Sequence, residues 1–152
     1  MDIRKIEWSV AKAALHSFLP EVKNFLPSDI ADAAKAAGFQ IKLFRISDPE
    51  QVRSDESLLS EFIHHAGRYI RGQCIVVPDE AFDKAEAPYI MDASDFTDFV
   101  DSFPHIVFDG DLIIICKDSS VIVGYQFEGT YSVIFVAIPG NAIDEKFGKE
   151  RE

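Results

Sequence analysis

Apolar residues recur at helical spacing in the first part of the chain. Between Ile3 and Phe18 they fall every three or four positions and Pro20 follows, which predicts an amphipathic helix ended by proline. A second, alanine-rich helix is expected from Ser28 to Gly38. The serine hydroxyl can accept a hydrogen bond from a free amide of the first turn, and the glycine can close the helix in a left-handed conformation.

Strand and helix patterns then alternate. Apolar and polar residues alternate from Phe39 to Ile46, which predicts a strand. Asp48-Pro49 is a helix-start signal, and helical spacing continues to Ile70, with Gly72 ending the helix. The apolar run from Cys74 to Val77 predicts a short buried strand that Pro78 stops.

The second half of the chain has the pattern of an antiparallel meander of about four strands between His105 and Ile138. Asp109-Gly110 supplies a hairpin turn, because glycine tolerates the positive φ that a tight turn requires. The strands after it are expected at 112–117, 121–127 and 131–138, and two of them are apolar on both faces, so helices of the first half should cover one face of the sheet. The predicted fold is α+β, with N-terminal helices packed on a mainly antiparallel sheet that ends in a C-terminal β-meander. One domain is expected over residues 1–140, followed by a polar tail at 141–152.

The composition indicates which class of protein this is. The chain has 152 residues, of which 47% are hydrophobic, so it can bury a core and is not a disordered chain. Its longest apolar run is far shorter than the roughly 20 residues of a membrane span, and the polar N-terminus does not fit a signal peptide. We therefore expect a soluble cytoplasmic protein. Cys74 and Cys116 each lie in an apolar segment, which favours buried thiols in a reducing compartment over the alternative of a disulfide.

The charge is concentrated in one segment. The chain carries a formal charge of −11, and residues 79–111 hold ten acidic residues against the single basic Lys84. Nucleic acids and anionic membranes are recognised by lysine and arginine, so this charge argues against both as partners. A cationic protein is the expected partner.

Within that segment, residues 92–104 fit a helix with its aromatic residues on one face and aspartates on the rest. Aspartates at three-residue spacing repel each other and, beyond the first turn, oppose the helix dipole, so the arrangement should cost stability unless a cation binds there. The alternative is a solvated face that only confers solubility. The candidate partner-binding residues are Asp92, Asp95, Asp98, Asp101, Asp109 and Asp111. Aromatic residues between them could anchor the partner or could all point into the core; these are Phe82, Tyr89, Phe96, Phe99, Phe103 and Phe108.

No nucleotide-binding, hydrolase, zinc or calcium-loop signature is present, so we expect a non-catalytic protein without cofactor or metal. The alternative from a different class is a small-ligand-binding or hydrolytic domain with a pocket near His64 or His65 and Arg68 or Arg71. Adjacent histidines on a helix point about 100° apart and cannot chelate one metal, so one should lie at the edge of the core and one in solvent. The lone histidines at positions 16 and 105 are interpreted as structural.

The chain combines a compact acidic domain, helices first, a meander from His105 to Ile138, no catalytic signature, and charge gathered between Asp79 and Asp111. In this combination it resembles the immunity proteins of bacterial polymorphic-toxin systems, including contact-dependent growth inhibition. The resemblance is one of type and rests on no specific motif. It implies a protein that binds a toxin domain, often a basic nuclease, and occludes its active site. A structural subunit with a solubilising acidic face is a further alternative.

Overall fold

The computed structural model describes residues 3–22, 24–47, 55–78, 87–102, 111–127 and 131–140. Its strands are β1 (Arg4–Lys5), β2 (Gln40–Ser47), β3 (Gln73–Pro78), β4 (Tyr89–Asp92), β5 (Leu112–Cys116), β6 (Val121–Phe127) and β7 (Tyr131–Ile138). Its helices are α1 (Trp8–Phe18), α2 (Pro27–Ala36), α3 (Asp55–Ala66) and α5 (Phe96–Ser102), with the short 3₁₀ helices η1 (Gly67–Tyr69) and η2 (Ala93–Asp95).

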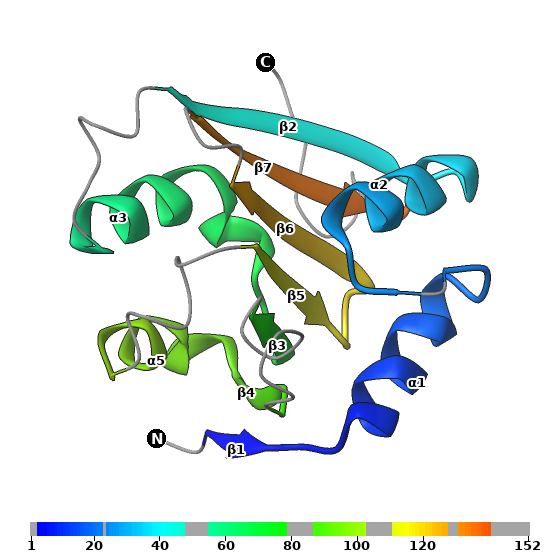
Figure 1. Cartoon of the computed structure of the whole chain (residues 1–152), viewed down its shortest axis with the longest axis horizontal. Helices are drawn as coiled ribbons and strands as arrows, with labels where there is room; N and C mark the ends of the chain where they lie inside the picture. Colours follow the sequence, from blue (N-terminus) through cyan, green and yellow to red (C-terminus); the bar gives the residue numbers. More distant parts are fainter. Residues whose placement is uncertain are drawn as a thin grey trace.

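The strands form a single antiparallel sheet of seven strands in the order β1-β4-β3-β5-β6-β7-β2 (Figure 1). The chain runs directly from β5 through β6 to β7, so the expected C-terminal meander is confirmed for three strands. The strand and turn expected at residues 105–110 lie outside the described residues. Two strands from the first half of the chain extend the meander, because β3 pairs with β5 and β2 pairs with β7.

Helices cover both faces of this sheet. On one face, α3 and α5 contribute Phe62, Phe96 and Phe99 to a buried cluster with alternate strand residues such as Ile114. On the other face, α1 and α2 pack against a second cluster that includes Ile113. Figure 1 shows α3 and α5 at the left and α1 and α2 at the right. The α+β class is therefore confirmed, and the helices of the first half of the chain divide between the two faces.

The central strands are buried on both faces, as their continuous apolar runs predict. All five residues of β5 are buried, and Ile134 to Ile138 of β7 are buried as well. Because two helical layers exclude water from both faces, these strands do not show the alternation of apolar and polar residues seen in a half-exposed sheet.

The N-terminal helix begins later than its apolar spacing predicts. Arg4 and Lys5 form an edge strand that pairs with β4, and the helix starts only at Trp8. The amide of Ile6 donates to the carbonyl of Pro88 at 2.9 Å, so the chain remains extended beside β4 up to this point. The helical periodicity of Ile3 and Ile6 was misleading because a partner strand, β4, was not recognised in the sequence.

Candidate partner-binding surface

The first carboxylate of the acidic segment that the structure describes is that of Asp92, the last residue of β4. Its carboxylate accepts hydrogen bonds from the Ser94 hydroxyl at 2.6 Å and from the Ser94 backbone amide at 3.0 Å. These bonds, first from the hydroxyl and then from the amide, hold the pKa of Asp92 below its usual value because they stabilise the charged form. Asp92 is thus the N-cap of η2, and its side chain is exposed to solvent.

Asp95 and Asp98 lie in the first turns of two successive short helices. The segment expected as one helix begins as the 3₁₀ helix η2 and continues without a break as α5, with Asp95 in the first turn of η2 and Asp98 in the first turn of α5. Negative charge near a helix N-terminus is favoured by the free amides and by the dipole. The expected unfavourable interaction with the dipole concerned aspartates beyond the first turn, so it does not apply to Asp95. Asp95 is half-buried and Asp98 is exposed.

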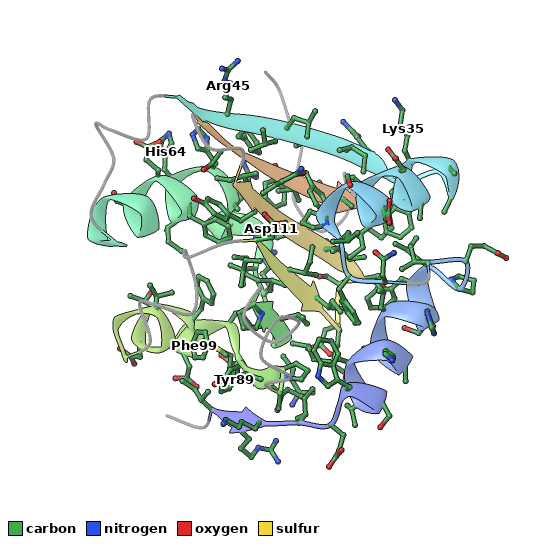
Figure 2. All side chains as sticks on the ribbon, viewed as in Figure 1. Lys35, Arg45, His64, Tyr89, Phe99 and Asp111 are labelled. Carbon is green, nitrogen blue, oxygen red and sulfur yellow. The ribbon has the colours of Figure 1, made fainter. Side chains whose placement is uncertain are left out.

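The aromatic residues of the same segment are core residues where the structure describes them. Tyr89 is 7% exposed, Phe96 2% and Phe99 0%. The rings of Tyr89 and Phe99, which are labelled in Figure 2, lie 4.9 Å apart between centroids, and the ring of Phe96 lies 5.8 Å from that of Phe62 of α3. The interpretation of these three residues as partner anchors is wrong, because α5 uses this face to pack on the sheet. The other candidate anchors lie outside the described residues; they are Phe82, Phe103 and Phe108.

Asp111 is separated from the other described carboxylates. Asp92 pairs with Gln73 at the start of β3, whereas Asp111 precedes Leu112, which pairs with Pro78 at the end of β3. The two aspartates are thus about six residues apart along β3, or roughly 20 Å. Asp111 is half-buried, and its negative charge adds to the raised pKa of Tyr125.

The candidate acidic surface among the described side chains consequently contains Asp92, Asp95 and Asp98, which we call the acidic turn. Asp101 belongs to α5, but its side chain is outside the description, as is the whole of Asp109. Phe96 and Phe99 fix the turn to the core from the inner side. The arrangement presents carboxylates to solvent from a rigid backbone, which suits recognition of a positively charged surface.

The residues of the alternative ligand site contact one another and their neighbours, and the rings of His64 and His65 lie 4.9 Å apart between centroids. His65 stacks on Phe44 of β2 with 4.9 Å between ring centroids, and its Nε2 lies 3.5 Å from Glu61 Oε1. His64 is exposed, so the expected division into one core-edge and one solvated histidine is confirmed. The Nε of Arg71 donates to the carbonyl of residue 68 at 2.9 Å. These contacts do not favour a reactive pocket at this place.

A pocket does occur at the connection between α1 and α2, where no sequence pattern predicted one. Its volume is about 370 Å³, and it is lined by Lys12, Leu15, His16, Pro20, Glu21, Val22, Asn24 and Phe25. His16 lies on its wall and donates from Nε2 to the carbonyl of Val22 at 2.8 Å, so the structural interpretation of this histidine is confirmed. The pocket was missed because its lining combines one helix turn with an irregular connection and contains no recognisable motif.

Within the described part of the chain, no three histidine, cysteine or acidic side chains come together as a metal-binding group. Among the same residues, no helix has the length and apolar character that crossing a membrane requires. Comparison of the chain with protein-family profiles, with curated proteins and with solved structures gave no match.

Proposed function

We propose that this protein is a non-catalytic inhibitor that binds a cationic protein partner, and that it acts in the cytoplasm as an immunity protein against a toxin domain of the basic nuclease class. The observation that carries the proposal is the acidic turn, in which the exposed Asp92 and Asp98 flank the half-buried Asp95. The charge of the surrounding segment supports it, because residues 79–111 contain ten acidic residues and one lysine.

The physical basis is electrostatic complementarity. A nuclease binds its substrate through lysine and arginine residues that contact phosphates, and carboxylates can occupy the same positions. A rigid acidic surface also attracts such a partner over a distance of about a Debye length and increases the association rate. The backbone of the acidic turn is held by the Asp92 cap and by Phe96 and Phe99 in the core, so little order has to be gained on binding.

The experiment is a measurement of association kinetics with the partner protein, isolated by affinity capture on the full chain and identified by mass spectrometry. The double variant Asp95→Lys/Asp98→Lys reverses two charges of the acidic turn. We expect its association rate constant to fall about tenfold or more at low salt, since steering by surface charge changes association rates by 10- to 1000-fold. The wild-type rate should also fall as salt is raised.

A matched control has the same change in net charge at another place. Glu21→Lys/Asp32→Lys reverses two exposed acidic residues outside the segment, in the connection between α1 and α2 and on α2. We expect this variant to keep an association rate close to that of the wild type. Equal rates for both double variants, or a wild-type rate that does not depend on salt, would eliminate the acidic turn as the binding surface.

A further inference from the structure

Cys74 and Cys116 lie directly opposite each other in the centre of the sheet. Cys74 is in β3, Cys116 is in β5, and the two residues are partners in the antiparallel register. Their sulfurs are 3.7 Å apart and unbonded, and both residues are at most 1% exposed. The sequence places each cysteine in an apolar strand, and only the register of the strands brings them together.

The pair occupies the type of cross-strand position that suits a disulfide. The amide of Lys117 donates to the carbonyl of Gln73 at 3.0 Å, so Gln73 and Lys117, the neighbouring pair, are hydrogen-bonded to each other across β3 and β5. The carbonyl of Cys116 instead accepts from Ser120 at 3.0 Å, on the side of β6. Cys74 and Cys116 are therefore a non-hydrogen-bonded pair, where the Cα atoms of antiparallel strands approach to about 4.5 Å and the side chains are closest.

This backbone geometry falls within the range of natural disulfides, in which Cα atoms are about 4.4–6.8 Å apart and the sulfurs about 2.05 Å apart. From the present 3.7 Å, each sulfur has to move by less than about 1 Å. The two residues are held in this register by β3 and β5 along their whole length. Bond formation therefore requires no change in strand pairing.

The segment that leads into β3 covers the two sulfurs. Cys116 Sγ lies 3.7 Å from the carbonyl oxygen of Tyr69, and Cys74 Sγ lies 3.6 Å from that of Gly72. Cys74 is the second residue of β3 and Cys116 is the last residue of β5, so both are at an end of the strand ladder. Local opening at a strand end needs much less free energy than global unfolding, and it exposes the pair to a reagent.

We propose that Cys74 and Cys116 form a reversible dithiol–disulfide couple within the native fold, oxidised by a low-molecular-weight disulfide of the glutathione class. One cysteine thiolate attacks the reagent disulfide and forms a mixed disulfide, which releases one glutathione thiolate. The second cysteine thiolate then attacks the protein sulfur and releases the second glutathione. The two cysteine thiols lose two protons and two electrons, and the reagent disulfide is reduced to two thiols.

The cross-link changes the stability of a defined part of the chain. It closes a loop from residue 74 to residue 116 that contains β4, η2 and α5, and with them the acidic turn. A loop of this length removes much conformational entropy from the unfolded chain. The hydrogen bond between the two thiols, together with burial, raises the pKa of Cys74, and the same hydrogen bond lowers the pKa of Cys116, so Cys116 is the thiol that attacks the reagent disulfide first.

The test incubates the native full chain with mixtures of reduced and oxidised glutathione in mildly alkaline buffer. Free thiols are then alkylated in denaturant and counted by intact mass. We expect complete conversion to an intramolecular disulfide that dithiothreitol reverses, an unchanged far-UV circular dichroism spectrum, and a rise in Tm of about 10 °C. The single variants Cys74→Ala and Cys116→Ala are the matched controls, and their Tm should not rise with oxidised glutathione.

Two results would overturn the proposal. One is a native chain that keeps both thiols under conditions that fully oxidise the urea-unfolded chain. The other is a disulfide that forms and leaves Tm unchanged or lowers it. If neither alanine variant folds, the measurements on the wild-type chain still decide between these outcomes. The test needs no partner protein, so its result is independent of the proposed inhibitor function.

Discussion

The contact between Gly124 and Phe135 allows a quantitative prediction about the core. Gly124 lies in the middle of β6 and pairs with Phe135 of β7, and the ring of Phe135 covers the glycine. A Cβ atom added at Gly124 would lie 2.5 Å from Cζ and 2.6 Å from Cδ2 of that ring. Carbon atoms in ordinary contact are about 3.5–4.0 Å apart, so Gly124→Ala forces the ring or the strand to move by about 1 Å.

The magnitude follows from two opposing effects, and the severe overlap with the ring places the first of them near the upper end of its range. Overpacking of this size costs about 1–3 kcal/mol, and Phe135, which is only 3% exposed, gains exposure when its ring is displaced. Alanine has less conformational freedom than glycine in the unfolded chain, so it stabilises a strand by about 0.5–1 kcal/mol relative to glycine. We expect Gly124→Ala to lower the free energy of unfolding by about 2 kcal/mol.

The sign should change when the ring is removed. Phe135→Ala alone is expected to cost about 3–5 kcal/mol because it leaves a cavity over Gly124. In that background Gly124→Ala meets no ring and occupies part of the cavity, so it should stabilise by about 0.5–1 kcal/mol. The coupling energy between the two sites is then about 3 kcal/mol, at the upper end for residues in direct contact.

The assay is urea unfolding of the four chains of this double-mutant cycle. It is followed by far-UV circular dichroism and by the fluorescence of Trp8, the single tryptophan, whose ring packs 5.5 Å from Phe25 on the same face of the sheet. Additive effects of the two substitutions would refute the reasoning, as would a Gly124→Ala variant with the stability of the wild type.

Three further predictions concern single polar contacts. The buried hydroxyls of Tyr125 and Ser132 are 3.0 Å apart, so Tyr125→Phe should cost about 1–2 kcal/mol in urea unfolding, and adding Ser132→Ala should recover most of this. Burial raises the pKa of Tyr125, so the contribution of its protonated hydroxyl to stability is complete below about pH 10 and is lost as pH rises through the folded-state pKa. Tyr125→Phe should therefore flatten the alkaline limb of a profile of Tm against pH. An identical limb would contradict this. Hydrogen bonds from the Ser94 hydroxyl and amide lower the pKa of Asp92, so the contribution of its carboxylate to stability is present above about pH 4 and is lost as pH falls through the folded-state pKa. Asp92→Asn should make the acid limb of the same profile shallower, and a limb as steep as that of the wild type would count against the cap. His16→Ala removes the bond to the α1–α2 connection and should cost about 1 kcal/mol in urea unfolding, whereas no loss would show that solvent replaces the bond.

Much of the fold could be predicted because buried segments are apolar, and apolar residues can be read directly from the sequence. The continuous apolar runs of β5 and β7 indicate strands covered on both faces, and helical spacing with flanking proline and glycine located α2 and most of α1. Strand β4 was missed because it has only four residues, which is too short for a pattern to be distinguished from a loop. For the same reason the residues before Trp8 were assigned to a helix, since their partner strand was unknown.

The candidate site was predicted less completely. Charge counts located the acidic segment, but they did not show that its helix begins as the 3₁₀ helix η2, capped by Asp92, before it continues as α5. Sequence also could not decide whether Phe96 and Phe99 face solvent or core. A helix face with three aromatic residues is equally consistent with an anchor surface, and only packing against the sheet distinguishes the two.

The sequence by itself determined which segments are apolar enough to form this sheet, where most of its helices lie and where the negative charge is concentrated, because these properties depend on residues near each other in the chain. Tertiary structure decided the strand order, the position of Asp111 some 20 Å from Asp92 along the sheet, the contact of Phe135 with Gly124, and the pairing of Cys74 with Cys116. Each of these depends on the register between strands. Register is set by the summed packing of two faces against four helices in the described chain, and no local pattern records it.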